Sequence, residues 1–185
     1  MSNPKPCATP DHASMAMDTQ LIESWKPSGS EVLEALRLLL GARRTHYVRS
    51  TQVSKYQHCH TMAYLMQRSE SPLLEDPRTK AEAVVAALFH DAFGAVSPQH
   101  HAGMAYWALK PFLTNEDVAD ALLYHDLLMA SHWFPRKYTL ESFIHEQWFP
   151  MGLLFRDYDI AAFTPIDTRD AYFGVELQAV FGVSA

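Results

Sequence analysis

A strongly apolar segment, Ala83-Val-Val-Ala-Ala-Leu-Phe-His-Asp-Ala-Phe93, lies near the middle of the chain. Seven apolar residues run into an imidazole and a carboxylate, and Asp76-Pro77 ahead of them is a helix cap followed by proline at the first helical position. The pattern predicts a helix over residues 78–91. Burying His90 and Asp91 at the end of so apolar a helix would cost several kcal/mol if nothing compensated it. Metal coordination is one of the few ways to make that placement favourable.

Helical patterns also precede this stretch. Ser30 is placed to cap a helix whose apolar residues recur at i, i+3 and i+4 spacing. These residues are Val32, Leu33, Leu36, Leu39 and Leu40. A second helix is predicted over residues 53–68, and its apolar side consists of Tyr56, Met62, Ala63, Leu65 and Met66.

Two more helices are predicted directly after the central stretch. The pair Ser97-Pro98 repeats the cap-and-proline pattern and starts a helix that should stop near Pro111. Thr114, with Asp117 three residues later, resembles a capping box that opens a helix through about residue 129.

The C-terminal part continues in the same way. A helix is predicted from residue 139 to 163, and Pro150 must kink it or split it. A last helix is predicted over residues 168–181, with Gly182 as its stop signal. The chain therefore reads as one all-α domain of about seven helices over residues 29–185. Residues 1–28, which hold four prolines, are predicted to be a loosely ordered tail with a short helix near Leu21 to Trp25.

Composition narrows the possible functions. The chain has 185 residues, of which 48% are hydrophobic, so it can bury a large core. Its 15 Lys and Arg against 21 Asp and Glu give a net charge of -6, which disfavours binding to nucleic acid or to an anionic membrane surface. No apolar run approaches the roughly 18 residues of a membrane span, and the N-terminus lacks the pattern of a signal peptide. The two cysteines, Cys7 and Cys59, suggest neither a CxxC motif nor a disulfide framework. We therefore expect a cytoplasmic protein.

The common catalytic motifs are missing. The sequence contains no GxGxxG, GxxxxGK[ST], GxSxG or HExxH. The sequence therefore gives no motif support for a dinucleotide-binding protein, a P-loop protein, a serine hydrolase or a zincin.

Ten histidines are the unusual feature of the composition. A single buried histidine is more often a satisfied core residue than a metal ligand. Six histidines and aspartates that fall on or beside the predicted helices are harder to explain as independent core residues. Imidazole and carboxylate groups together are suitable ligands for Fe, Mn, Zn or Co. We call them the six candidate ligands: His58, His90, Asp91, His101, His125 and Asp159.

Three stretches in this order resemble the HD-domain superfamily of all-helical metal enzymes. They are Val53-Ser-Lys-Tyr-Gln-His58, Ala87-Leu-Phe-His-Asp91, and Arg156-Asp-Tyr-Asp159 followed by Ala161-Ala-Phe163. The resemblance covers about residues 47–181. Many members of the superfamily are phosphohydrolases.

The additional His101 and His125 make the chain similar to the dinuclear branch, which includes myo-inositol oxygenase, HD-domain phosphonate oxygenases and some cyclic-dinucleotide phosphodiesterases. This resemblance implies that Asp91 bridges two ions. It also implies that one ion is held by His58, His90 and Asp159, and the other by His101 and His125.

Gln57 and Arg156 resemble residues of the phosphonate-oxygenase subgroup. The resemblance implies that Gln57 hydrogen-bonds substrate and that Arg156 clamps an anionic group, although Arg156 can equally be a surface ion pair. Other positions of the subgroup differ, with Gly94 in place of a histidine and Met129 in place of a lysine, so its phosphonate substrate is not carried over.

The leading expectation is a dinuclear enzyme that uses mixed-valent iron and O₂ to oxidise or cleave a small polar, anionic or hydroxyl-bearing metabolite. The alternative is a phosphohydrolase on nucleotides or other phosphate esters that uses Mn, Co or Zn in the same frame. A third is a degenerate HD fold that serves as a binding module.

Among the neighbouring residues, Lys55 is read as a solvated lysine and Tyr56 as a core tyrosine. His60 is read as a packing or surface residue, and His101 is favoured over His100 as a ligand. Residues 131–138 are either a lid over the site or a solvated connection.

Overall fold

The computed structural model describes residues 27–48, 52–133, 140–141, 143–164 and 166–183, with the side chains of residues 131–133 left aside. This part of the chain is all-helical, as the sequence predicts, and contains seven α-helices and four short 3₁₀ turns. The helices are α2 (Gly29–Gly41), α3 (Lys55–Gln67), α4 (Pro77–Phe89), α5 (His101–Leu109), α6 (Glu116–Trp133), α7 (Phe149–Ala161) and α8 (Gly174–Phe181).

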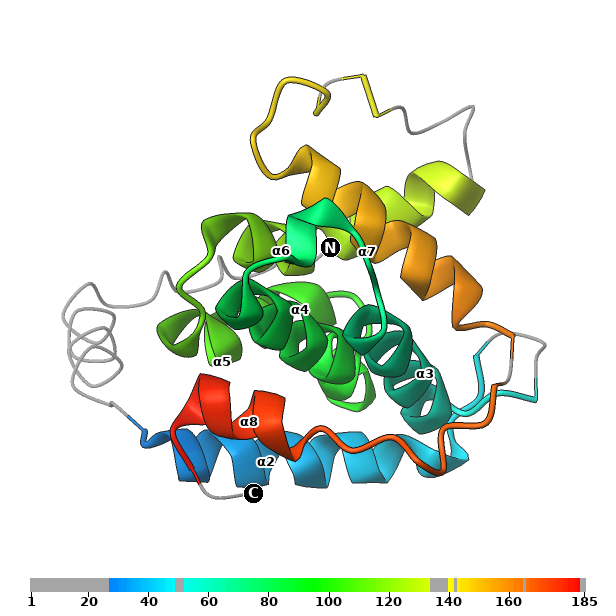
Figure 1. The fold of residues 1–185 in the computed structure, drawn as a ribbon. Coiled ribbons are helices and arrows are strands. Elements are labelled where there is room, and N and C mark those ends of the chain that lie inside the picture. The colour runs from blue at the N-terminus through cyan, green and yellow to red at the C-terminus, as the bar shows by residue number, and fades with distance from the viewer. Residues whose placement is uncertain (1–26, 49–51, 134–139, 142, 165, 184–185) are drawn as a thin grey trace, which may run out of the picture.

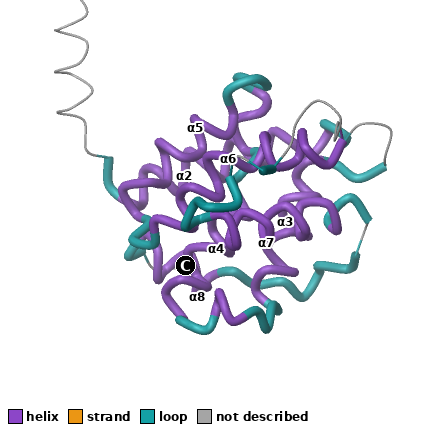
Figure 2. Tube along the Cα trace, turned by 90° about the horizontal axis from the view of Figure 1, so that it is seen from above, coloured by secondary structure: helices purple, strands orange, loops and turns teal. Residues whose placement is uncertain are grey.

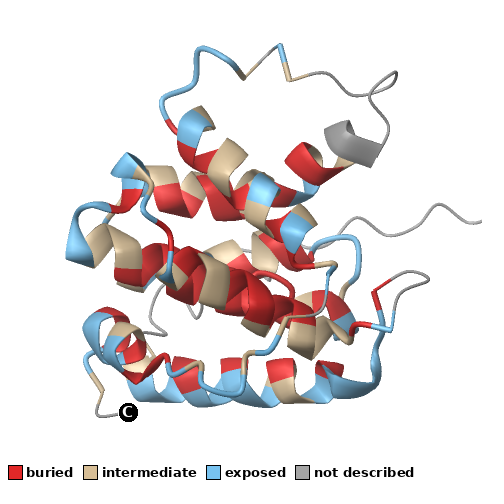
Figure 3. Cartoon of the chain, turned by 45° about the vertical axis from the view of Figure 1, so that its right-hand side comes forward, coloured by how far each residue is buried: buried red, intermediate tan, exposed pale blue. Residues whose placement is uncertain are grey.

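Helix α4 lies at the centre of the fold (Figure 1). It packs against α3, α6 and α8, while α7 packs across α6 and also contacts α3. Figure 3 shows the central helix buried along most of its length, and every residue from 81 to 89 is buried. The apolar run over residues 83–89 is therefore the middle of the core, and the buried residues His90 and Asp91 follow directly at its C-terminal end.

The predicted start of α4 is correct. Asp76 is the N-cap, its carboxylate accepts a hydrogen bond from the backbone N–H of Thr79 at 2.7 Å, and Pro77 occupies the first helical position. The helix ends at Phe89, two residues before the predicted end, and the chain turns at His90 and Asp91 into a 3₁₀ turn.

Glu82 ties α4 to the start of α6. Its buried carboxylate accepts hydrogen bonds from the backbone N–H groups of Thr114 and Asn115, at 3.0 and 2.8 Å, and from the Thr114 hydroxyl at 2.6 Å. Arg78 adds a further bond from Nε at 2.6 Å. The predicted capping box of Thr114 and Asp117 is therefore wrong. Thr114 is held by Glu82, and the Asn115 side chain accepts from the Val118 N–H instead.

Other predicted helix ends are also corrected. The cap of α2 is Ser28 rather than Ser30, because Ser28 and Glu31 form a reciprocal capping box. Helix α5 begins at residue 101, after a turn, instead of at 97, and α8 begins at 174 instead of 168. Pro150 does not kink a long helix. It lies in the first turn of α7, where a missing N–H costs nothing.

Helix α6 runs four residues past the predicted end, to Trp133, so the first part of the suggested lid is helical. The rest of that segment, residues 134–139, and the predicted tail helix at 21–25 lie outside the described residues. Within the described part of the chain, none of the helices combines the length and apolar character needed to cross a membrane.

The view from above shows α6 and α8 on opposite sides of α4, and both helices contact it (Figure 2). Residues 90–100 connect α4 to α5, and the 3₁₀ turn Ala92–Ala95 lies within this connection. Residues from five helices are thereby brought to one region beside the C-terminal end of α4.

Candidate metal centre

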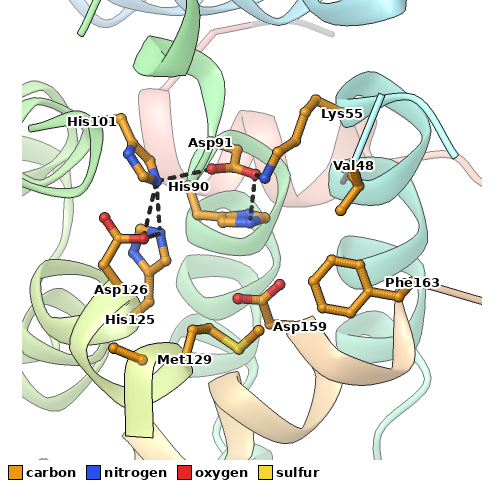
Figure 4. Close-up of a pocket in the computed structure, with 11 residues that line it drawn as sticks. Val48, Lys55, His90, Asp91, His101, His125, Asp126, Met129, Asp159 and Phe163 are labelled. Atoms are coloured by element: carbon orange, nitrogen blue, oxygen red, sulfur yellow. Dashed lines mark hydrogen bonds and ion pairs between the residues drawn. The ribbon is translucent and has the colours of Figure 1, made fainter. Parts of the chain in front are cut away.

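A cavity of about 230 Å³ lies beside the C-terminal end of α4 (Figure 4). Five of the six candidate ligands line it: His90, Asp91, His101, His125 and Asp159. The sixth, His58, is fully buried behind Asp159. The six residues come from α3, the end of α4, α5, α6 and α7, and all six are buried.

The first cluster consists of His58, His90 and Asp159. One ligand atom from each lies within 4.8 Å of the others. His58 Nε2 is 2.9 Å from Asp159 Oδ1, yet the contact lacks the alignment of a hydrogen bond, and His90 Nε2 is buried without a hydrogen-bond partner. Nitrogen and oxygen atoms thus converge on a shared space, which is the arrangement of a metal site.

The second cluster consists of Asp91, His101 and His125. His101 Nε2 lies 2.9 Å from Asp91 Oδ1 and 3.3 Å from His125 Nε2. Asp91 also reaches the first cluster, because its Oδ2 lies 3.5 Å from His90 Nε2. One carboxylate therefore faces both clusters, with a different oxygen toward each.

Three of the imidazoles are oriented by the backbone. Nδ1 of His90 donates to the Ala87 carbonyl at 2.8 Å, Nδ1 of His101 to Pro98 at 2.9 Å, and Nδ1 of His125 to Leu122 at 2.7 Å. A carbonyl only accepts, so each Nδ1 carries the proton, and each Nε2 is left to act as a ligand toward the cavity. Fixed Nδ1–H groups of this kind accompany most metal-binding histidines.

The electrostatics of the clusters favour a bound cation. Burial lowers the pKa of His90 to about 4, so its ring is neutral, as a metal ligand must be. Burial alone would raise the pKa of Asp91, but His90, the hydrogen bond from His101 and the Lys55 ammonium outweigh it and hold that pKa well below its usual value. The pKa of Asp159 is also lowered, since contacts with His58 outweigh its burial.

The surroundings of the His101 ring favour a positive charge at this position. Burial opposes protonation of its ring, yet the hydrogen bond to Asp91 raises its pKa above the usual value. Since the Nδ1–H donates to Pro98, a second proton taken up by this ring would lie on Nε2, between Asp91 and His125. A metal ion bound there would replace that proton.

Lys55 corrects one prediction from the sequence. It is not a solvated lysine, because its ammonium group pairs with Asp91 Oδ2 and lines the cavity. Burial works against its charge, but Asp91 raises its pKa, so the charge is kept. Lys55 precedes His58 by three residues, almost one helical turn, and this spacing in the sequence could have indicated that the two side chains lie on the same face of the helix.

The structure places the two proposed substrate residues on α3 and α7. Gln57 is half-buried in the first turn of α3, where its backbone N–H donates to the Ser54 hydroxyl. The Arg156 guanidinium hydrogen-bonds to the adjacent Asp157 at 2.9 Å. Neither side chain is among the described residues that line the cavity.

Other residues complete the cavity walls. Val48, Met129 and Phe163 provide apolar surface, and Phe163 stacks on the His58 ring with centroids 5.0 Å apart. Asp126 lies at the mouth, 3.4 Å from His101 Nε2 with its side chain half exposed. Apolar residues that line a cavity cannot be distinguished in the sequence from apolar residues of similar size in the core.

Cys59 and His60 follow His58 in the sequence, and neither of them lines the cavity. Cys59 is fully buried and forms a third possible group with His90 and Asp91, and burial raises its pKa well above the usual value. His60 faces away from the cavity and stacks on Tyr56 at 4.3 Å, with its pKa lowered to about 4 by burial and by Arg44. His100 is exposed.

The geometry establishes buried His, Asp and Cys clusters that can hold a metal ion. Comparisons of the chain with protein-family models, with curated proteins and with solved structures give no match.

Proposed function

We propose that the protein is a dinuclear metal enzyme of the HD-domain type. The single observation that carries the proposal is the set of three imidazoles whose Nδ1–H groups are fixed by backbone carbonyls and whose Nε2 atoms face two carboxylates. A buried core histidine needs one partner, whereas these rings leave a second nitrogen directed into a polar cavity.

The donor set fits two ions. His58, His90 and Asp159 would hold the first, and His101 and His125 the second, with Asp91 shared between them. Neutral imidazoles with carboxylates suit Fe, Mn, Zn or Co more than Mg or Ca. The same residues carry the resemblance to the dinuclear HD-domain branch.

The favoured activity is oxidation of a small polar or anionic metabolite by a mixed-valent diiron centre. The metals would supply O₂ activation and removal of hydrogen from a substrate C–H bond. The protein would supply the rest. The Lys55 ammonium would attract an anionic or hydroxyl-bearing group, and Val48, Met129 and Phe163 would limit access of water to the centre.

Spectroscopy of the iron-loaded protein tests this activity. The protein is incubated anaerobically with Fe(II), exposed to a limited amount of O₂ and examined by electron spin resonance. We expect the signal of a coupled Fe(II)/Fe(III) pair. A signal from isolated iron only, with one iron bound per chain, would refute the diiron activity.

A matched pair of variants tests whether the coupled iron signal depends on the first cluster. Asp159→Asn removes one charge from the first cluster and should abolish the coupled signal. Asp157→Asn is its control, because Asp157 is exposed on the same helix and its ion pair in the described part of the chain is with Arg156. Loss of the signal in both variants would indicate a general effect of charge or folding.

A second activity, hydrolysis of phosphate esters, is favoured by Lys55. A fixed ammonium beside two metal sites suits a phosphoryl group, whose negative oxygens need several cations. Incubation of the Mn- or Co-loaded protein with a panel of nucleotides and sugar phosphates without O₂ separates the two activities. Phosphate release without O₂ would favour the hydrolase, and turnover that requires O₂ would favour the oxygenase.

A further inference from the structure

A second cavity, of about 410 Å³, lies on the other side of α3 from the metal centre. Its walls come from the C-terminal half of α2 and the turn after it, from α3, from the end of α4, and from the segment that enters α8. Figure 1 shows α2 and α8 side by side beneath α3 and α4, so this cavity lies at the junction of the lower and central helices.

Two arginines provide positive charge at this cavity. Arg37 and Arg44 are seven residues apart, which places them on one face of α2 and its 3₁₀ extension. Neither guanidinium forms an ion pair with a carboxylate in the part of the chain that is described, and none of the described wall residues is acidic. In a chain of net charge -6, two uncompensated cations at one cavity are a local attraction for an anion.

The remaining walls are apolar and aromatic. Leu40, Phe89 and Leu177 are buried and form part of the floor. The Arg44 guanidinium lies over the Tyr56 ring, 4.6 Å from its centroid, so the aromatic ring holds this charge in place without neutralising it. The cavity thus combines a cationic rim with an apolar floor.

The helix geometry separates this cavity from the metal centre. Residues 56 and 60 are four apart and share one face of α3, whereas residue 58 is about 200° away from residue 56. Tyr56 and His60 accordingly line the second cavity, while His58 points toward Asp159. The two sites use opposite faces of the same helix.

From this geometry we infer a second binding site, for a small organic anion that carries an apolar body. Its anionic group would pair with Arg37 and Arg44, and its apolar part would pack on Leu40, Phe89 and Leu177. The site requires both features, because a small inorganic anion would leave the floor uncovered and a neutral apolar molecule would leave the guanidinium groups unpaired. This inference does not depend on the activity proposed for the metal centre.

Calorimetric titration of the metal-free full chain with naphthalene-2-carboxylate tests the site. We expect one molecule bound per chain with a Kd below about 1 mM. The nearly isosteric neutral naphthalene-2-carboxamide and the small anion acetate should each bind at least about tenfold more weakly. Equal binding of the carboxylate and the carboxamide, or no binding of the carboxylate at about 10 mM, would overturn the inference.

Substitutions at the two arginines test whether the carboxylate binds in the second cavity. The double change Arg37→Gln and Arg44→Gln should weaken carboxylate binding by about tenfold or more. Arg68→Gln is the matched control, because Arg68 is an exposed arginine at the C-cap of α3 that lies over the Tyr64 ring, 4.7 Å from its centroid, outside the cavity. Asp91→Asn tests the metal centre as the alternative location and should leave binding unchanged. Loss of binding in Asp91→Asn, or unchanged binding in the double variant, would overturn the assignment.

Discussion

At the scale of single residues, the hydrogen bonds of the Nδ1 atoms set how the histidines of the candidate metal centre are oriented. Ala87 lies in the last turn of α4, where carbonyl oxygens have no helical N–H partner, so its oxygen is free to accept from His90. The same i to i−3 contact recurs at His101 and His125. A local backbone feature thus sets the tautomer of each ring before any ion binds.

Lys55 gives a prediction at this scale. Its ammonium group competes with a metal ion for Asp91 and repels a cation in either cluster. Lys55→Met should therefore bind Mn²⁺ about tenfold more tightly than the unchanged protein, as measured by titration of the metal-free chain. The control is Lys110→Met, whose ammonium pairs with the exposed Glu116. Weaker Mn²⁺ binding in Lys55→Met would mean that the lysine supports the centre instead.

His90 makes the metal-free protein sensitive to acid. Its pKa is about 4 when folded and near 6.5 when unfolded, so the unfolded chain binds the extra proton between these pH values. The free energy of unfolding should therefore fall as pH drops from 6.5 to 4, by on the order of 3 kcal/mol from this residue. His60 acts in the same direction.

Urea unfolding of His90→Gln at several pH values isolates the contribution of His90. The variant should lose less stability than the unchanged protein between pH 6.5 and 4. His145→Gln, at an exposed histidine, should show the full pH dependence. Identical slopes for His90→Gln and the unchanged protein would contradict a neutral buried ring.

At the scale of helices, Glu82 connects two elements that carry ligands. The pKa of Glu82 is lowered because its hydrogen bonds outweigh its burial, so the carboxylate is charged when folded. Glu82→Ala should cost about 3 kcal/mol of unfolding free energy, since it leaves Arg78 and two backbone N–H groups without their acceptor. Chemical denaturation measures the loss, and Glu75→Ala, at an exposed site, should change stability little. Similar losses in both variants would contradict a specific role.

The contact between α6 and α7 depends on a glycine. A Cβ at Gly152 would lie 2.7 Å from the Trp148 ring and 2.9 Å from a Leu128 methyl group. Gly152→Ala should lower the unfolding free energy by about 1–3 kcal/mol. Gly103→Ala, in α5 with open space around it, should raise stability by about 0.5–1 kcal/mol. Thermal melts of the two variants should shift in opposite directions, and a stabilised Gly152→Ala would contradict the packing described.

The sequence predicted the presence of the helices more accurately than the residues at which they begin and end. The cap of α4 was found because Asp76-Pro77 acts locally, within one turn of the chain. The start of α6 was assigned to the wrong residues because Glu82, 32 positions away in the sequence from Thr114, supplies the acceptor. A local pattern cannot reveal such a long-range partner.

At the scale of the whole molecule, five helices contribute the six candidate ligands. The sequence predicted these residues from their types and order, and the structure brings all six together around one end of α4. It did not predict the cation at Lys55, and it left Arg156 open between a clamp for substrate and an ion pair such as the one with Asp157. Both depend on side-chain direction, which follows from packing between helices.

Metal analysis of the protein purified without chelators and reloaded anaerobically with Fe(II) tests the dinuclear centre most directly. We predict two irons per chain in the unchanged protein and loss of both in Asp91→Asn, because that carboxylate faces both clusters. At most one metal ion per chain, or two irons retained by Asp91→Asn, would contradict a dinuclear centre bridged by Asp91.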